Sequence, residues 1–351
     1  MYSCVDTFLD TPAGPVPRVR TRRGPGDWAG TALARLGITR DNYVVSPGLY
    51  AVGTPDAASP VIVTANYKLT FDVVREDLAG QHVWLLVLDT RGINVWCAAG
   101  KNLFSTDEVV RRIRRAELDK VVSHRRVVLP QLGAPGVSAR EVRRATGFSV
   151  VYGPVRSADL PDFLAAGQKA TEAMRLVDFP LRERAVLIPV ELVLLWKTLL
   201  LAFCAVFVLS GIGPHVFSFT EAVTRLGGFA WATLFGVLAG HVGVPLLLPR
   251  IPFRAFAAKG AVAGACVLPL LVFAVWAGAA GAAGSGGPGL MEWVALGLWT
   301  VTISSFLAMN FSGSTPYASP SGVEWEMRRA VPLQALVVVV CAFLWVFAAF
   351  V

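Results

Sequence analysis

Hydrophobic and polar positions follow two different patterns along this chain of 351 residues, and the change falls near residue 180. In the first part, short apolar runs predict buried strands at 60–68, 81–89, 125–131 and 148–154. Helical patterns separate or follow them, at 69–78, from Ser105, from Ser138 and through about 159–176. This alternation predicts an α/β head, a mainly parallel sheet with flanking helices, whose ligands bind beyond the carboxyl ends of the strands.

The second part is a series of long apolar runs. Each is close to the roughly 20 residues that a helix needs to cross about 30 Å of hydrocarbon. We therefore expect a transmembrane domain of five helices, at about 186–209, 228–248, 256–278, 291–312 and 331–351.

Charge divides the chain in the same way, since 23 of the 32 Lys and Arg and 18 of the 24 Asp and Glu precede residue 181. We expect an N-terminal arm (1–55), largely irregular with one helical turn around residues 31–37 and packing on the head, a head (56–180) and the transmembrane domain (181–351). The polar, Pro-rich start has no signal-peptide pattern. Basic residues collect in alternate loops, which places the head in the cytoplasm and Val351 outside a cytoplasmic (inner) membrane. These basic residues are Arg182, Arg184, Arg250, Arg254, Lys259, Arg328 and Arg329.

Glu191, Lys197 and His241 are ionisable residues within the expected spans, away from the span ends. Such residues mark a pathway or a site by default, because burying them is costly. The alternative is that Lys197 extends to the interface while the other two bind neighbouring helices. The five cysteines are scattered and form neither a disulfide framework nor a CxxC metal pair.

A basic stretch from Val110 to Arg126 has only Glu117 and Asp119 as acidic residues. It is either a solvated helix face or a surface for anionic lipid or an acidic redox partner. Nucleic acid is disfavoured, because aromatic residues for base stacking are missing. Its basic residues are Arg111, Arg112, Arg114, Arg115, Lys120, Arg125 and Arg126.

Two helix starts have capping-box spacing, Ser105 with Glu108 and Ser138 with Glu141. The loop GAPG (133–136) precedes the second of them, and GPVR (153–156) follows the last strand. Gly-rich loops of this kind offer free N–H groups to an anion, although many are simply tight turns.

The segment NVWCAAGK (94–101) is the strongest candidate for chemistry. Asn94 is a good N-cap, so Cys97 falls in the first turn of a helix. Free N–H groups there and Lys101 one turn later stabilise a thiolate. The small residues beside the sulfur leave room for a large, flat ligand, whereas the alternative is an inert cysteine buried in a helix.

At these residues the sequence resembles the corrinoid protein of the two-component mercury-methylation system, whose signature is NVWCAAGK. The likeness extends over SPVIVTANYKLTFD, VWLLVLDTRGINVWCAAGK, LPQLGAPGV and GFSVVYGPVRSADLP, and over the apolar second half. The head also resembles the corrinoid-binding domain of the corrinoid iron–sulfur protein of acetyl-CoA synthesis. The D-x-H-x-x-G ligand motif of other cobalamin domains is missing, because Thr90, Arg91 and Gly92 follow Asp89.

The resemblance implies that residues 94–101 form a cap helix over the lower face of a cobalamin or related corrinoid, with Cys97 as the axial ligand to cobalt. It implies that Thr64 lies close to the corrinoid, and that two loops hold the macrocycle and its nucleotide tail. The cofactor-binding residues would be Thr64, Asn94, Val95, Trp96, Cys97, Ala98, Ala99, Gly100, Lys101, Gly133, Ala134, Pro135, Gly136, Gly153, Pro154 and Val155.

The activity implied is a methyltransferase that passes a methyl group from Cys-ligated methylcobalamin to Hg(II), giving methylmercury. A thiolate donates strongly to cobalt, which favours release of the methyl group as a carbanion equivalent or a radical. The implied partners are a small ferredoxin with two [4Fe-4S] clusters, as electron donor, and a folate-type methyl donor system. The alternatives are a different methyl acceptor, or a non-enzymatic membrane sensor or transporter with a corrinoid-binding head.

Overall fold

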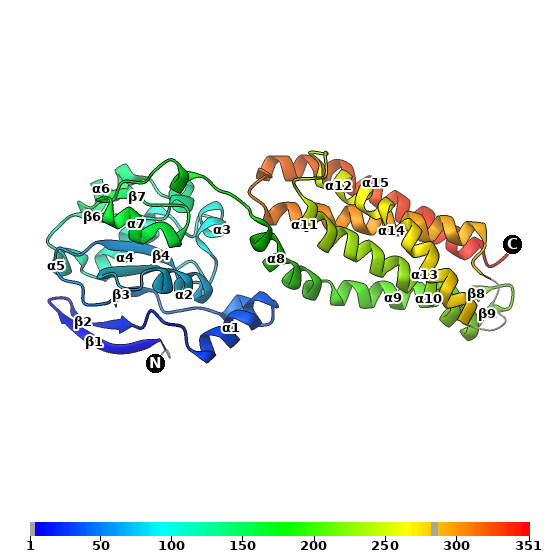
Figure 1. Ribbon diagram of the computed structural model, residues 1–351, viewed down its shortest axis with the longest axis horizontal. Coiled ribbons are helices and arrows are strands. Elements are labelled where there is room, and N and C mark those ends of the chain that lie inside the picture. Colours follow the sequence, from blue (N-terminus) through cyan, green and yellow to red (C-terminus); the bar gives the residue numbers. More distant parts are fainter. Residues whose placement is uncertain (1–3, 282–286) are drawn as a thin grey trace. The chain divides into compact units, whose positions relative to one another are not determined.

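The computed structural model describes residues 4–281 and 287–351 and divides into two compact units, Met1–Val177 and Asp178–Val351. The first unit is an α/β domain around one seven-stranded sheet (Figure 1). Its strand order is β1-β2-β3-β5-β4-β6-β7. The strands are β1 (Val5–Thr11), β2 (Gly14–Val19), β3 (Gly48–Val52), β4 (Val61–Ala65), β5 (Val83–Leu88), β6 (Arg126–Leu129) and β7 (Ser149–Tyr152).

The four strands expected from the apolar runs are confirmed as β4, β5, β6 and β7, and they run parallel to one another. β3 is antiparallel to β5, and β1 and β2 form an antiparallel hairpin beside it, so the sheet is mixed. The helical turn expected around residues 31–37 is present as part of the longer helix α1, but the expectation that the rest of residues 1–55 is irregular is wrong, because this segment supplies three strands. The strands of this segment pair through backbone hydrogen bonds, which the pattern of apolar and polar residues in the sequence does not reveal.

Helices cover the sheet on both faces (Figure 1). β5 is apolar throughout, because Leu85 and Val87 enter one core cluster while Leu86 and Leu88 enter the other. The helices are α1 (Pro25–Arg35), α2 (Lys68–Asp77), α3 (Val95–Gly100), α4 (Thr106–Arg115), α5 (Leu118–Val121), α6 (Ala139–Thr146) and α7 (Leu160–Ala165). Short 3₁₀ segments occur at Arg40–Asn42, Gln131–Gly136, Ser157–Asp159 and Ala173–Arg175.

Both expected helix caps are present, since Ser105 and Ser138 accept hydrogen bonds from the N–H groups of Glu108 and Glu141. The expected helix through 159–176 is much shorter. It consists of α7 between 3₁₀ segments, because Gly167 adopts a positive φ and ends the helix.

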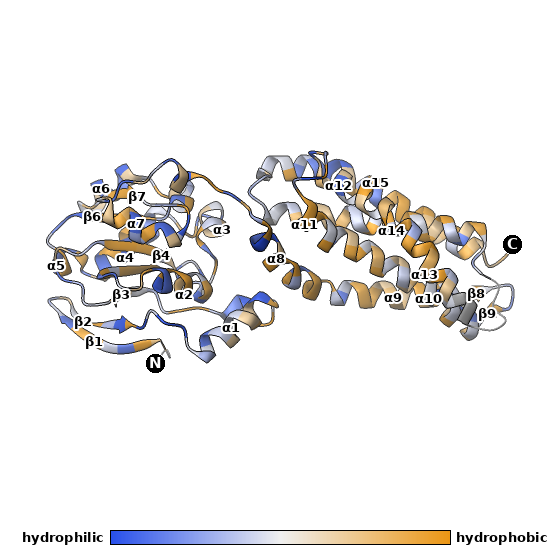
Figure 2. Ribbon diagram, viewed as in Figure 1, coloured by the Kyte–Doolittle hydropathy of each residue, from blue (hydrophilic) through white to orange (hydrophobic). Residues whose placement is uncertain are grey.

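The second unit is helical, and apolar residues dominate most of its helices (Figure 2). Its elements are α8 (Leu181–Leu194), α9 (Trp196–Gly211), α10 (Phe219–Val237), a π-helical stretch (Leu238–Gly243), α11 (Val244–Leu247), α12 (Phe256–Cys266), α13 (Leu268–Gly281), α14 (Leu290–Phe311), a 3₁₀ turn (Ser312–Ser314) and α15 (Pro320–Phe347). A small hairpin joins β8 (Ile212–Gly213) to β9 (Val216–Phe217).

Among the described residues of this unit, three helical segments are long and apolar enough to cross a membrane: 219–247, 290–311 and 321–347. The count rises to five if two bent pairs each form one span. These pairs are α8 with α9, bent by 47°, and α12 with α13, bent by 42°. The five expected apolar segments therefore all appear as helix, and two of them are broken.

Glycines allow close packing against α14. A Cβ on Gly260 would overlap the carbonyl oxygen of Ser304, and one on Gly240 would lie 2.7 Å from the same atom. Close approach of helices at glycines suits an apolar bundle, whatever the bundle does.

An ion pair also joins two helices of this unit, since Arg225 pairs with Glu292 at 2.6 Å.

Candidate functional site

The site lies where the parallel strands end. Thr64 is the fourth residue of β4, α3 follows β5, the 3₁₀ segment Gln131–Gly136 follows β6, and Gly153 follows β7. Since these four strands are parallel neighbours, their carboxyl ends meet at one edge of the sheet. The segments singled out in the sequence are thereby collected at that edge.

The helix α3 carries Cys97 at its third position. Asn94 is the N-cap, and its side-chain oxygen accepts a hydrogen bond from the N–H of Cys97 at 2.9 Å. Val95, Ala98 and Ala99 are buried and hold the helix on the domain, whereas Cys97 is exposed. The alternative of a buried, inert cysteine does not fit this exposure.

A tight turn positions α3, and its organising residue, Asn66, was not anticipated from the sequence. The side-chain oxygen of Asn66 accepts hydrogen bonds from the N–H groups of Thr90 and Gly92, both at 3.0 Å. The Thr90 hydroxyl lies 2.7 Å from the carbonyl oxygen of Ile93 and 2.9 Å from the same Asn66 oxygen. Gly92 has φ +73°, a left-handed conformation that glycine adopts without strain. The only sequence signal for Asn66 is its place directly after a strand.

Glu108 ties the start of this turn to α4. Its carboxylate accepts a hydrogen bond from the N–H of Asp89 at 2.8 Å and forms ion pairs with Arg111 and Arg112. Glu108 is buried, so these arginines neutralise a charge that helps to hold the turn. Two residues of the expected basic face therefore have a structural role inside the domain.

The loop 133–136 packs behind α3. A Cβ on Gly136 would overlap the carbonyl oxygen of Phe104 and lie 3.3 Å from Cα of Ala99. A Cβ on Gly133 would lie 2.6 Å from the Phe104 ring. Glycine is thus required by close approach at both positions, and the loop supports the cap helix from the side.

A cavity of about 260 Å³ opens beside α3 at the same edge. Seven of the expected cofactor-binding residues line it: Thr64, Asn94, Val95, Trp96, Gly153, Pro154 and Val155. Further lining residues, which sequence reasoning missed, are Ile62, Val63, Thr70, Val74, Val128, Leu129, Pro130, Leu132, Ser157 and Leu160. Four of them, Ile62, Val63, Val128 and Leu129, are strand residues whose apolar character indicated only burial.

The other expected residues lie around this cavity without lining it. Gly100 and Lys101 are exposed at the end of α3. Ala98 and Ala99 lie on the buried side of the same helix. The loop that supports the helix consists of Gly133, Ala134, Pro135 and Gly136. In the described parts of the chain, no group of three or more His, Cys, Asp or Glu could hold a metal ion. Cys97 is therefore a single thiol donor at an open surface, next to an apolar cavity.

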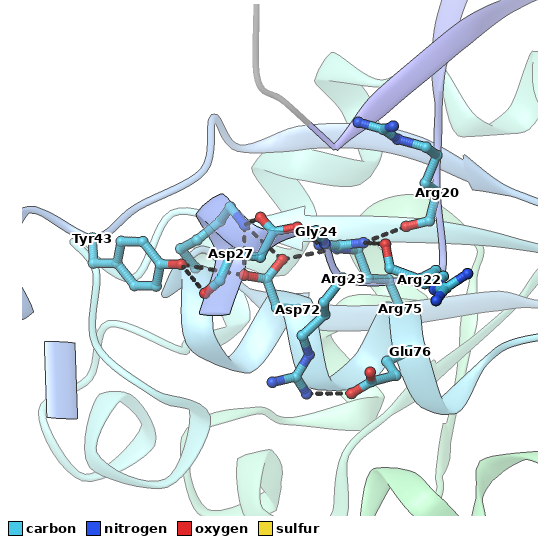
Figure 3. A network of polar contacts seen from close by, with 10 residues as sticks. Arg20, Arg22, Arg23, Gly24, Asp27, Tyr43, Asp72, Arg75 and Glu76 are labelled. Carbon is cyan, nitrogen blue, oxygen red and sulfur yellow. Dashed lines mark hydrogen bonds and ion pairs between the residues drawn. The ribbon is translucent and has the colours of Figure 1, made fainter. Parts of the chain in front are cut away.

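A buried ion cluster joins α1 to α2 in the same domain (Figure 3). Lys68 binds Asp27 and Asp72 at 2.8 and 2.5 Å, and Arg75 binds the same two carboxylates at 2.8 Å each. Burial alone would raise the pKa of Asp27, but hydrogen bonds from Lys68 and the Gly24 N–H, with the charges of Lys68 and Arg75, lower it to about 2. The cluster was not anticipated from the sequence.

Part of the first unit is similar to subunits of complexes that make or cleave acetyl-CoA. Residues 39–164 match the family described as CO dehydrogenase/acetyl-CoA synthase delta subunit. The chain is 38% identical over 127 residues to acetyl-CoA decarbonylase/synthase complex subunit gamma of Methanopyrus kandleri, covering 36% of this chain and 27% of that protein. The same subunit of Methanocaldococcus jannaschii is 36% identical over 127 residues, covering 36% and 26% of the two chains.

A third relative, the gamma subunit of Archaeoglobus fulgidus, is 34% identical over 122 residues, covering 34% of this chain and 26% of that protein. The chain thus spans about a quarter of the length of these curated relatives. The matched stretch includes β3 to β7 and α3, so it contains every expected site residue. The expected relation of the head to acetyl-CoA synthesis subunits is confirmed.

Proposed function

We propose that this chain is a membrane-anchored, corrinoid-dependent methyltransferase that acts on Hg(II). The observation that carries the proposal is the exposed thiol of Cys97 on a capped helix, beside an apolar cavity at the carboxyl edge of the parallel strands. The relatedness of this domain to subunits of acetyl-CoA synthesis supports a corrinoid as its ligand.

The residues present fit such a cofactor. A corrinoid brings most of the donors for its own cobalt, so one soft sulfur donor at an open surface would suffice to hold it from the protein side. Ala98 and Ala99 add no bulk beside the sulfur, and a Cβ on Gly100 would meet open space. The cavity walls formed by Thr64 and 153–155 would hold the cofactor's nucleotide tail.

The bound corrinoid supplies a cobalt ion that carries the methyl group. Cys97 would hold that metal from the protein side, and its thiolate would donate electron density to it. Such donation would favour transfer of the methyl group to Hg(II). Asn94 fixes the backbone of Cys97 in this geometry, and the turn around Asn66 fixes the helix on the sheet. Hg(II) is proposed as the acceptor because residues 94–101 resemble the signature of the mercury-methylation system.

We also propose that the helical unit anchors the protein by five spans in the cytoplasmic (inner) membrane, with the head in the cytoplasm and the C-terminus outside. The clustering of basic residues in alternate loops supports this orientation. Arg184 donates to the carbonyl oxygens of Pro245 and Leu246, and Lys259 to those of Leu248 and Ile251. Arg184 thus links the start of α8 to α11, and Lys259 links the start of α12 to the residues that follow α11.

The proposed partners are a small ferredoxin with two [4Fe-4S] clusters and a folate-type methyl donor system. The support for an acidic electron donor is a basic surface on α4 and α6, which pack against each other. Because Arg111 and Arg112 pair with Glu108, the surface depends on other exposed arginines. These are Arg114, Arg115, Arg140, Arg143 and Arg144.

A second candidate, in which the helical unit transports or senses a ligand, is favoured by one observation. His241 is buried in the π-helical stretch, and among the described residues neither of its ring nitrogens has a hydrogen-bond partner. Bundles that only anchor seldom retain such a group. Loss of methylmercury formation on Cys97→Ala, with His241→Ala retaining it, would favour the methyltransferase.

The deciding experiment compares the full chain with Cys97→Ala after loading with a corrinoid. We expect the visible spectrum to change and methylmercury formation to fall by at least ~100-fold, because the axial donor and its electron density are lost. Cys204→Ala, at another exposed cysteine, is the matched control and should leave both unchanged. A spectrum and an activity that both survive Cys97→Ala would rule the proposal out.

A further inference from the structure

The helix α1 buries a carboxylate and exposes large apolar side chains. Its acidic residue, Asp27, is only 6% exposed and pairs with two cations of α2, whereas Trp28 is 55% exposed and Leu33 is 40% exposed. Ile38, just beyond the helix, is 66% exposed. Trp28, Leu33 and Ile38 thus form an apolar surface, here called the outer face of α1. Monomeric soluble domains seldom leave large apolar side chains grouped in this way.

The ion cluster under α1 fixes this orientation (Figure 3). Asp27 gives one carboxylate oxygen to Lys68 and the other to Arg75, both at 2.8 Å. Arg75 also donates to the carbonyl oxygens of Arg20 and Arg22, which lead into α1. Turning the outer face inward would leave Lys68 and Arg75 buried with Asp72 as their only carboxylate, which is strongly unfavourable. The apolar residues therefore point outward as a consequence of the fold.

Arginines precede and follow the outer face along the chain. The guanidinium of Arg23 lies 5.0 Å from the centre of the Trp28 ring and pairs with Glu76 at 2.6 Å. Arg22 and Arg40 are exposed on either side of the helix in the sequence. An apolar centre that contains Trp and Leu, with arginines around it, is the composition of helices that lie in the headgroup region of anionic bilayers.

The chain also keeps the head within reach of such a surface. Only residues 176–180 connect the last 3₁₀ segment of the head to α8. Five extended residues span at most about 18 Å. If the helical unit is embedded in a membrane, a lipid surface is therefore always near the head.

We propose that the outer face of α1 docks the head onto the headgroup region of an anionic lipid bilayer. The proposal rests on the membrane anchoring proposed above, but not on the identity of the methyl acceptor. Trp28, Leu33 and Ile38 insert between the lipid headgroups, and Arg22 and Arg40 bind lipid phosphates. Docking holds the head at the membrane surface without any contact to Cys97.

The test uses the full chain in lipid nanodiscs of phosphatidylcholine and phosphatidylglycerol in a ratio of about 7:3, since anionic lipid is required. A photo-crosslinking residue replaces Leu33 (Leu33→p-benzoylphenylalanine). The matched control carries it at Phe8, which is 50% exposed on β1. Mass spectrometry of the irradiated protein distinguishes phospholipid adducts from crosslinks to protein.

We expect phospholipid adducts at position 33 to exceed those at position 8 by about tenfold. Arg22→Gln or Arg40→Gln should each lower the yield about fivefold, and discs of phosphatidylcholine alone should lower it similarly. Crosslinks from position 33 to residues 178–351 or to a second copy, or a lipid yield no higher than at position 8, would overturn the proposal. Retention of the chain in the discs is scored separately, so a failure of docking is distinguishable from a failure of anchoring.

Discussion

The side-chain oxygen of Asn94 lies 2.9 Å from the backbone nitrogen of Cys97 and accepts its hydrogen bond. This bond closes the first turn of α3, a helix of only six residues. So short a helix has little stability of its own and depends on its cap and its packing. The position of the sulfur is therefore set by Asn94 as much as by Cys97 itself.

Asn94→Ala should loosen this first turn. Loss of an N-cap costs about 1 kcal/mol, and here the cost falls on the helix that carries the thiol. We expect corrinoid affinity to fall by about fivefold and methylmercury formation to fall with it. Ser218→Ala removes the cap of α10 in the helical unit and is the control. Equal losses in both variants would show that Asn94 has no special role.

Asn66→Ala should displace α3 without touching any cofactor. The substitution leaves the N–H groups of Thr90 and Gly92 without their acceptor, at a cost of about 1–3 kcal/mol for each buried group. We expect a weakened corrinoid complex and a raised rate of amide hydrogen exchange at 90–97. Asn102→Gly, at an exposed position past the end of α3 whose φ of +56° glycine adopts without strain, should change neither quantity. Unchanged exchange in Asn66→Ala would contradict this role.

Gly136→Ala tests the loop behind α3. Its new methyl group would collide with the backbone of Phe104 and press on Ala99, so either the loop or α3 has to move. We expect the free energy of unfolding, measured by thermal denaturation, to fall by about 1–3 kcal/mol, and we expect the corrinoid to bind less tightly. Gly48→Ala, in β3, meets nothing within 4 Å and should behave as wild type. A wild-type corrinoid affinity for Gly136→Ala would show that the loop does not support the cap helix.

The parallel strands of the head were predictable because each is a short apolar run with turn residues at its ends. The caps at Asn94, Ser105 and Ser138 followed from residue type and spacing alone. β1 and β2 were missed because their side chains are only partly apolar. β3 is apolar and buried, but it is short, and pairing along the backbone leaves no pattern in a single sequence.

For the site, the order of strands and loops along the chain was enough to predict that the candidate segments meet at one edge of the sheet. It was not enough to find Asn66, whose three neighbours in the turn lie 24 to 27 positions further along. The Asp27–Lys68 ion pair, at a separation of 41 residues, was invisible for the same reason. Contacts between distant polar residues depend on the tertiary fold, which periodicity does not encode.

The ion cluster predicts a pH dependence for the stability of the head. The pKa of Asp27 is about 2 in the folded chain and lies near 3.8 without the fold. Its contribution to stability, about 2 kcal/mol, is therefore complete above pH 4 and is lost as the pH falls towards 2. We expect the protection of α2 amides against hydrogen exchange, measured on the full chain and relative to the intrinsic rate at each pH, to fall over this interval.

Asp27→Asn should remove that pH dependence and destabilise the head by about 3–5 kcal/mol at neutral pH, because Lys68 and Arg75 remain buried. The control is Asp6→Asn at the partly exposed pair of Asp6 with Arg18, which should cost less than about 1 kcal/mol. A steep acid dependence that persists in Asp27→Asn would assign it to another carboxylate.

The proposed ferredoxin surface predicts a salt-dependent association. Arg115 and Arg144 are exposed, and among the described residues neither forms an ion pair, so their charges are available to a partner. We expect Arg115→Glu with Arg144→Glu to weaken ferredoxin binding at low salt by at least about tenfold, and to flatten its dependence on salt. Lys120→Glu is the control, because Lys120 already pairs with Glu117 at 2.7 Å and should contribute less. An affinity and a salt dependence that the double variant leaves unchanged would place the ferredoxin elsewhere on the head.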